Sequence, residues 1–169
     1  MKTSRLDKYG KINRDKILSF SWDKKKYKGF EGDTLASALL ANNIGIVGRS
    51  FKYHRPRGIF SSGVEESGAL VTIGSKDKRD PNVRATTQEL YDGLEARGQN
   101  AFPNVNFDLA GINNYLGRFF AAGFYYKTFM GIPPFEWGKG TAIWMFFEKF
   151  IRKAAGMGSA SGLPDPDSY

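Results

Sequence analysis

The sequence predicts an α+β domain of the β-grasp type, in which a mixed sheet wraps around one helix, followed by a mostly helical or irregular extension. Three observations lead to this prediction. Apolar residues and serines alternate between Ile17 and Trp22, which is typical of a half-buried strand. A run with apolar residues at helical spacing follows from Leu35 to Asn42. A short β-branched run, Ala69–Ile73, then follows a loop. Strands on both sides of a single helix are typical of an α+β unit.

The first elements follow one another closely. The polar run 23–26 predicts a hairpin turn, and 27–30 would be the returning strand. Asp33 is well suited to cap the helix at 35–42, because a carboxylate accepts hydrogen bonds from the N–H groups of a first turn. Asn42, Asn43 and Gly45 favour the end of that helix.

The rest of the predicted domain is less regular. Proline, glycine and serine predict a loop at 49–63, and 74–82 reads as a charged surface turn. Strand character returns at 86–87 and again at 90–91. We therefore expect the β-grasp domain to occupy residues 1–98.

The extension begins where asparagines and prolines replace the regular pattern. Residues 109–120 have the spacing of a helix, and 141–155 predict an amphipathic helix with aromatic residues on one side. We expect 99–155 to be an aromatic, partly helical extension, and 156–169 to be a linker or tail rather than a phosphate-binding turn. The aromatic run 119–144 would pack against another domain.

Composition excludes several classes of site. The chain has 169 residues, a formal net charge of +8, one histidine and no cysteine. Disulfides, zinc–thiolate sites and cysteine-ligated iron–sulfur clusters are therefore excluded, and no metal site is expected. Apolar runs are far shorter than the ~20 residues of a membrane span, and the charged amino terminus is not a signal peptide. We expect a cytoplasmic protein with no membrane contact.

The best candidate site is a basic cluster formed by Arg49, Lys52, Arg55 and Arg57. Guanidinium groups bind phosphates with two hydrogen bonds, so this loop could cover a flavin phosphate or an acidic face of another subunit. The alternative is a solvated loop with internal salt bridges. His54 is interpreted as a structural or interface residue.

No catalytic set is found in the sequence. A nucleophile and base cannot be combined around the single histidine. Glu65 and Glu66 are adjacent, and adjacent side chains usually point apart, so we assign them no catalytic role.

Two stretches give the chain a recognisable family character: 32–42 running on to 47–59, and 84–94 followed by 122–130. In order and spacing they resemble the amino-terminal domain of the alpha subunit of heterotetrameric sarcosine oxidases. The resemblance extends from about Asp7 to Tyr169.

The resemblance implies a β-grasp fold related to plant-type 2Fe–2S ferredoxins. Relatives of this family keep a cysteine-bearing loop after the Pro-Arg-Gly motif, where this chain has 59–69. Ser61 or Ser62, Glu65 and Gly68 stand about where thiolates would be. None of them can hold a cluster, because iron–sulfur ligation requires thiolates.

The resemblance also implies a parent enzyme. It would oxidise sarcosine to glycine, releasing H₂O₂ and either formaldehyde or methylene-tetrahydrofolate, and its cofactors would be FAD, FMN, NAD and tetrahydrofolate. Its partners would be the other domains of the alpha subunit and the beta, gamma and delta subunits. We expect this chain to be a fragment or a split subunit that binds no cofactor alone. The basic cluster would lie at the alpha–beta boundary near the FMN.

An alternative of another class is a basic β-grasp module that binds nucleic acid or a protein partner and has no redox role. RNA readers interleave basic and aromatic residues on one sheet face. Here Phe51 and Tyr53 alternate with Lys52 and His54 only within a loop, and acidic residues follow directly. Nucleic-acid binding is therefore not expected.

Overall fold

The computed structural model describes residues 4–75, 78–116 and 141–154. The chain divides into two compact units, Met1–Ala121 and Ala122–Tyr169, and each is described by itself. Most of the aromatic run 119–144 and all of the tail 156–169 lie outside the described residues. The expected boundaries at 98 and 155 stay predictions.

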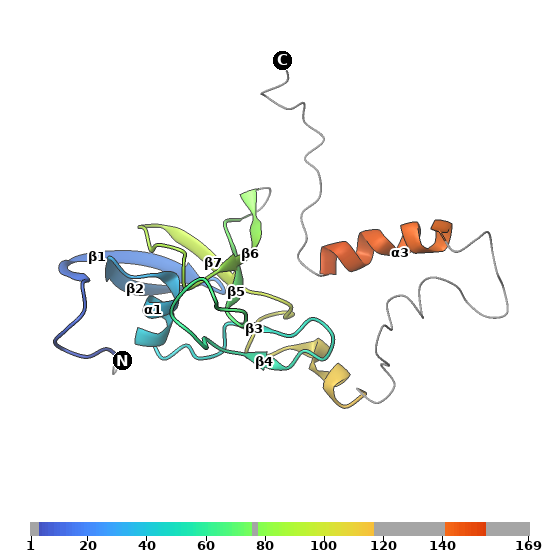
Figure 1. Cartoon of the computed structure of the whole chain (residues 1–169), viewed down its shortest axis with the longest axis horizontal. Helices are drawn as coiled ribbons and strands as arrows, with labels where there is room; N and C mark the ends of the chain where they lie inside the picture. The colour runs from blue at the N-terminus through green and yellow to red at the C-terminus, as the bar shows by residue number, and fades with distance from the viewer. Residues whose placement is uncertain (1–3, 76–77, 117–140, 155–169) are drawn as a thin grey trace, which may run out of the picture. The chain divides into compact units, whose positions relative to one another are not determined.

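The first unit contains a five-stranded mixed sheet with the strand order β2-β1-β7-β5-β6 (Figure 1). The central pair, β1 and β7, is parallel, and every other pair in this sheet is antiparallel. A mixed sheet with one helix confirms the predicted α+β, β-grasp fold. The strands are β1 (Asn13–Trp22), β2 (Lys25–Glu31), β5 (Leu70–Ile73), β6 (Asp80–Arg84) and β7 (Leu94–Gly98).

The hairpin of β1 and β2 is confirmed, with longer strands than predicted. Its turn is only two residues long, and Asp23 and Lys24 both have positive φ, 47° and 69°. Such a two-residue turn matches the right-handed twist of the flanking strands. Trp22 therefore pairs with Lys25, and Ser21 pairs with Lys26.

The helix α1 (Leu35–Ala41) is confirmed, but its N-cap differs from the prediction. Thr34 is the cap, and its side chain accepts a hydrogen bond from the backbone N–H of Ser37. Asp33 lies one residue earlier and is buried. Its carboxylate accepts hydrogen bonds from Arg5, from the Phe30 N–H and from the Ser37 hydroxyl. The first turn was therefore located correctly, while the capping residue was wrong by one position.

Three irregular regions differ from the predictions. The expected loop 49–63 begins with a small second sheet, β3 (Gly48–Arg49) paired with β4 (Pro56–Arg57). The expected surface turn 74–82 ends in strand β6. The last strand is 94–98 rather than 86–87 and 90–91, because its buried residues Leu94 and Ala96 alternate with exposed Glu95 and Arg97 beside β1.

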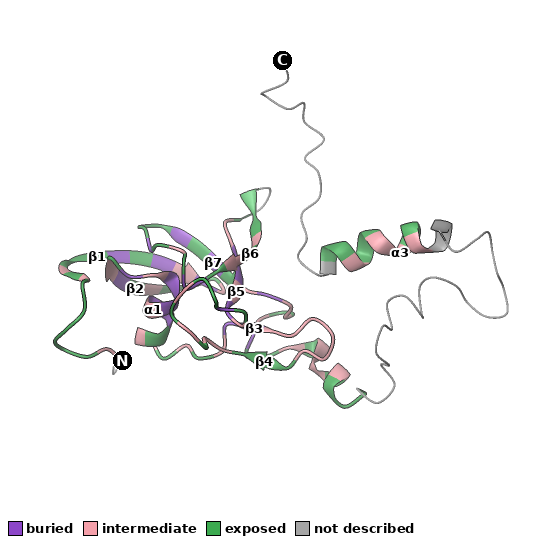
Figure 2. Ribbon diagram, viewed as in Figure 1, coloured by how far each residue is buried: buried purple, intermediate pink, exposed green. Residues whose placement is uncertain are grey.

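The core lies between the sheet and α1 (Figure 2). Apolar side chains that alternate on β1 and β7 face the apolar side of the helix, and their burial supplies most of the stabilisation of the domain. The largest members of the core are Leu18, Phe20, Trp22, Leu35, Leu39, Val47, Val71, Leu90, Leu94 and Val105.

Two further helices are described. A 3-10 helix, η2 (Leu109–Asn114), lies where a longer helix over 109–120 was expected. In the second unit, α3 (Thr141–Ala154) agrees with the expected amphipathic helix, and an ion pair joins Glu148 and Arg152 on one turn. Phe146 and Phe150 on this helix are each 61% exposed. Among the described residues, the helices are all too short or too polar to cross a membrane.

Candidate functional site

The basic cluster lies on the hairpin formed by β3 and β4. This turn is held by backbone hydrogen bonds from Ser50 to Arg55 and from His54 to Ser50. His54 adopts a positive φ of 54°, which places its ring toward the segment that contains η2. The sequence therefore gathers four basic residues on a short, well-braced turn.

The guanidinium group of Arg49 forms hydrogen bonds within the chain. Its Nε and one terminal nitrogen donate to the carbonyl of Val105 at 2.9 and 2.8 Å, and the other donates to the carbonyl of His54 at 2.9 Å. Its Nε also lies 3.6 Å from Asp108 Oδ2. Arg49 thus joins the hairpin to residues 105–108.

Asp108 is a residue of this network that the sequence did not single out. Its side chain is fully buried, and Oδ2 lies 2.8 Å from Nδ1 of His54. Its other oxygen accepts hydrogen bonds from the N–H groups of Phe102 and Ala110. The only available signal was its N-cap position before a helix, which does not reveal the pairing with His54, a residue 54 positions away. The predicted structural role of His54 agrees with this contact.

A shallow pocket of about 420 Å³ opens beside this network. Arg55 lines it, is exposed, and donates to the side chain of Asn114 at 3.2 Å. Arg55 and Lys52 both lie over the ring of Tyr53, at 4.7 and 4.9 Å from its centroid. Arg57 is exposed on β4 and does not line this pocket. The structure therefore brings together Arg49 and Arg55, while only Arg55 and Arg57 of the cluster are exposed.

A second notable feature is the loop 58–69, which folds around the carboxylate of Glu66. The N–H groups of Phe60 and Ser61 donate to Oε2, each at 2.6 Å. The N–H groups of Gly68 and Ala69 donate to Oε1 at 2.5 and 3.1 Å. Glu66 is 1% exposed. Four converging backbone N–H groups form an anion-binding nest, and this chain fills it with its own side chain.

The nest determines the charge state of Glu66. Burial alone would raise the pKa of this carboxyl, because it disfavours the charged form. The backbone N–H groups of Ser61, Gly68, Phe60 and Ala69 outweigh burial and lower the pKa from 4.5 to about 2. Glu66 is therefore an ionised, buried carboxylate whose charge is balanced by peptide dipoles rather than by a cation.

The neighbours of the nest fix its shape. A Cβ on Gly68 would lie 2.9 Å from the carbonyl oxygen of Gly58 and 3.1 Å from Glu66 Oε1, so only glycine fits without a shift. Thr86 is buried and donates its hydroxyl hydrogen to the carbonyl of Gly63 at 2.8 Å. Arg84 donates to the carbonyl of Glu66 at 3.2 Å. Glu65 is exposed, so the two adjacent carboxylates point apart as expected.

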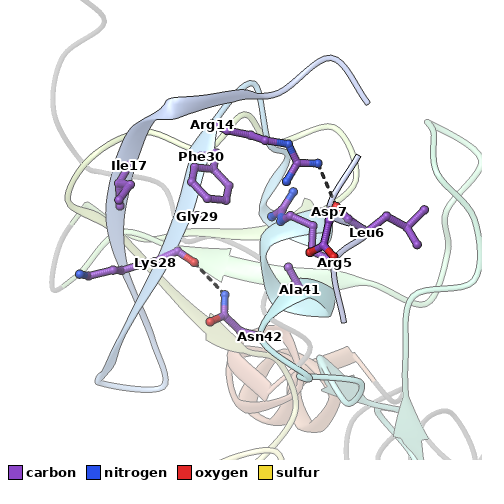
Figure 3. A pocket seen from close by; sticks show the side chains of 10 residues that line it. All are labelled: Arg5, Leu6, Asp7, Arg14, Ile17, Lys28, Gly29, Phe30, Ala41 and Asn42. Atoms are coloured by element: carbon purple, nitrogen blue, oxygen red, sulfur yellow. Dashed lines mark hydrogen bonds between the residues drawn. The ribbon is translucent and has the colours of Figure 1, made fainter. Parts of the chain in front are cut away.

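Another pocket, of about 300 Å³, lies between the amino-terminal segment, β2 and α1 (Figure 3). Two of its three cationic side chains, those of Arg5 and Arg14, have partners within the chain, and the third is Lys28. Arg5 forms a two-bond ion pair with buried Asp33, and Arg14 donates to the carbonyl oxygens of Leu6 and Tyr9. This pocket ties the amino terminus to the domain and is the weaker candidate for ligand binding.

Comparison with known proteins identifies the first unit. The family model described as "2Fe-2S iron-sulfur cluster binding domain" matches residues 15–101. The chain is 53% identical over 169 residues to the sarcosine oxidase subunit alpha of Rhizobium meliloti, and covers 16% of that protein. It is 47% identical over 89 residues to the sarcosine oxidase subunit alpha of Corynebacterium sp. strain U-96, covering 51% of this chain and 9% of the relative. These matches confirm the resemblance found in the sequence.

A solved structure is also similar. The crystal structure of L-proline dehydrogenase from P. horikoshii matches with a TM-score of 0.43 and 26% identity, over 52% of this chain and 16% of that chain. The chain thus spans less than a fifth of the length of each of these three proteins.

The residues present do not fit a 2Fe–2S cluster. Plant-type clusters use thiolates spaced C-x₄-C-x₂-C, with a fourth cysteine farther along the chain. In the loop that forms the nest, Ser61, Glu66 and Ala69 have this spacing. Glu66 and Ala69 each follow directly after the expected positions, Glu65 and Gly68. Of the two adjacent glutamates, Glu65 is exposed, whereas the side chain of Glu66 points into the loop. A hydroxyl, a carboxylate and a methyl group cannot replace three thiolates, and the chain contains no cysteine.

Proposed function

The chain belongs to the 2Fe-2S iron-sulfur cluster binding domain family, and on this basis we propose that it is the amino-terminal structural and assembly domain of a sarcosine oxidase alpha subunit. The observation that carries this proposal is 53% identity over all 169 residues to such a subunit. The same similarity favours this function over a separate nucleic-acid-binding module.

The whole enzyme would carry out a balanced oxidation. Sarcosine, O₂ and water become glycine, formaldehyde and H₂O₂, and with tetrahydrofolate the methyl carbon leaves as methylene-tetrahydrofolate instead. FAD, FMN, NAD and tetrahydrofolate would bind in other parts of the assembly. This chain would supply a folded platform for other domains of the alpha subunit and for the beta, gamma and delta subunits.

The exposed part of the basic cluster supports an assembly role. Arg55 and Arg57 are exposed on a turn that Arg49 and Asp108 hold in place from within. A rigid basic surface suits an acidic partner face, because opposite potentials favour association and fix its orientation. Arg55 could equally contact a flavin phosphate at this boundary, because its guanidinium is suited to phosphate oxygens.

The first experiment is a co-purification through a tag on this chain, expressed together with its neighbouring reading frames. A yellow complex that makes H₂O₂ when sarcosine is added supports the proposal. A yellow complex that oxidises another secondary amine but not sarcosine would retain the assembly role and change the substrate. Purification of this chain alone, without flavin, would contradict the proposal.

The second experiment tests the basic surface with Arg55→Glu combined with Arg57→Glu. Lys25→Glu combined with Lys26→Glu provides a matched control, because both are exposed cations on the β1–β2 hairpin and the change in net charge is the same. We expect the arginine double variant to retain less partner protein and less flavin, and the control to behave as the unmodified chain. Equal recovery of partner and flavin in both variants would contradict a role for this surface.

A further inference from the structure

The backbone of the loop 58–69 forms an anion site, and the group that fills it is a side chain of the same loop. Phe60, Ser61, Gly68 and Ala69 direct their N–H groups at a single carboxylate. Backbone nests of this kind surround phosphates and iron–sulfur clusters in other proteins. Without an anion, these four N–H groups would converge with no acceptor between them, and the repulsion of their partial positive charges would oppose this loop conformation.

The positions that would hold a cluster surround this carboxylate. Ser61, Glu66 and Ala69 have the C-x₄-C-x₂-C spacing, and the Ser61 hydroxyl lies 3.4 Å from Glu66 Oε2. Thr86 comes from a distant part of the chain and contacts the same loop through the carbonyl of Gly63. Its place agrees with the fourth, distant cysteine of the plant-type pattern.

We propose that Glu66 is an internal replacement for the iron–sulfur cluster of this family. Its carboxylate occupies the nest that a cluster would occupy, and it holds the loop in the conformation of a cluster-binding loop. The two groups are electrostatically comparable, because sulfides and thiolates outweigh two ferric ions and give the cluster a net negative charge. A carboxylate has no accessible redox state, so the domain keeps the fold of an electron-transfer module without electron transfer.

Hydrogen exchange in the full chain tests whether the Glu66 carboxylate holds the loop 58–69 in its conformation. In Glu66→Gln, the amides of Phe60, Ser61, Gly68 and Ala69 should exchange at least tenfold faster than in the unmodified chain, while amides of β1 and β7 change little. Glu65→Gln is the control, because that carboxylate is one position away and exposed, and it accepts a backbone hydrogen bond from Gly63, which is not one of the four nest residues. Unchanged protection in Glu66→Gln would overturn the proposal.

A second variant covers the case in which Glu66→Gln does not fold. Glu66→Ala leaves room for a small carboxylate, so acetate should raise its melting temperature more than chloride at equal ionic strength. The unmodified chain, whose nest is filled, should show no such difference. The absence of any acetate-specific effect on Glu66→Ala would count against an anion nest.

Cluster assembly tests whether Glu66 occupies the place that a cluster would take. The full chain with Ser61→Cys, Glu66→Cys, Ala69→Cys and Thr86→Cys, incubated anaerobically with iron and sulfide, should bind iron and sulfide in equal amounts and acquire the visible absorption of a 2Fe–2S centre. The matched control keeps Glu66 and carries the other three cysteines, and it should bind much less. A folded four-cysteine variant that binds no cluster would overturn the claim that Glu66 stands in the place of the cluster.

Discussion

Two of the buried carboxylates of the domain, those of Glu66 and Asp108, are stabilised in different ways. Glu66 is surrounded by backbone N–H groups, whereas Asp108 contacts the side chains of His54 and Arg49 in addition to two N–H groups. In the first arrangement, backbone N–H groups of the same loop donate to both oxygens of the carboxylate. In the second, contacts of Asp108 hold the β3–β4 turn in place, and Arg55 and Arg57 are exposed on that turn. The comparison indicates that Glu66 fills the loop 58–69, while Arg55 and Arg57 are exposed on the basic hairpin.

Removing the Glu66 carboxylate should have the largest effect on stability. In Glu66→Ala four donors lose their acceptor, and at about 1 kcal/mol for each donor the free energy of unfolding should fall by about 4 kcal/mol. Urea denaturation measures this change. Glu65→Ala removes an exposed hydrogen bond from the Gly63 N–H, and should lower stability by no more than about 1 kcal/mol. Similar values for the two variants would show that the nest does not stabilise the domain.

The pH dependence of stability should separate Glu66 from the other carboxylates. Because the pKa of Glu66 is lowered from 4.5 to about 2 in the folded chain, its stabilisation is complete above pH 4.5 and is lost as the pH falls toward 2. The unmodified chain should therefore be more stable than Glu66→Gln at neutral pH, and the difference should shrink between pH 4.5 and 2. A constant difference across this range would contradict an ionised Glu66.

Asp108→Asn tests the second carboxylate. The substitution keeps the shape of the side chain but removes the charge beside Arg49 and His54, and it should lower the free energy of unfolding by about 2 kcal/mol. Hydrogen exchange should increase between residues 100 and 114. Asp15→Asn, at an exposed position, is the control. A loss as small as that of the control would show that the brace is unimportant.

A glycine pair tests the geometry of the nest. Gly68→Ala should cost about 1–3 kcal/mol, because its Cβ would press on the Gly58 carbonyl and on Glu66. Gly111→Ala is a matched control, because no atom outside its own helix backbone and chain neighbours lies within 4 Å of its added Cβ. Thermal denaturation compares them. Equal melting temperatures would indicate that the loop adapts easily.

The smallest stability effect is expected on the exposed face of the hairpin. Arg55→Glu with Arg57→Glu should change the free energy of unfolding by no more than about 0.5 kcal/mol, because surface substitutions seldom do more. The effect of this variant should appear in assembly instead. A large loss of stability would show that Arg55 and Arg57, like Arg49, stabilise the folded chain through internal contacts.

Much of the fold was predictable because its signals are local. The alternation in β1, the apolar face of α1 and the amphipathic pattern of α3 each lie within one element. The small sheet of β3 and β4 was missed. The N-cap was wrong because the Asp33 carboxylate pairs with Arg5, 28 positions away. The position of β7 was wrong because this strand depends on its pairing with β1. Leu94 and Ala96, for example, form a strand only because β1 lies beside them.

The candidate site shows the same limit. The sequence alone determined that the chain has no thiolate, that a basic cluster exists at 49–57, and that the domain is of the ferredoxin-like β-grasp type. It could not show that Arg49 faces inward or that Asp108 meets His54, because those pairs join residues more than 50 positions apart.

The tertiary structure alone decided which of two adjacent glutamates is buried and what it does. Glu65 and Glu66 are chemically identical, and no pattern in the sequence distinguishes them. Only the folded loop turns one toward water and the other into four converging N–H groups. The physical reason is that a nest is made of backbone dipoles, whose directions depend on the conformation of the chain and not on the identity of its side chains.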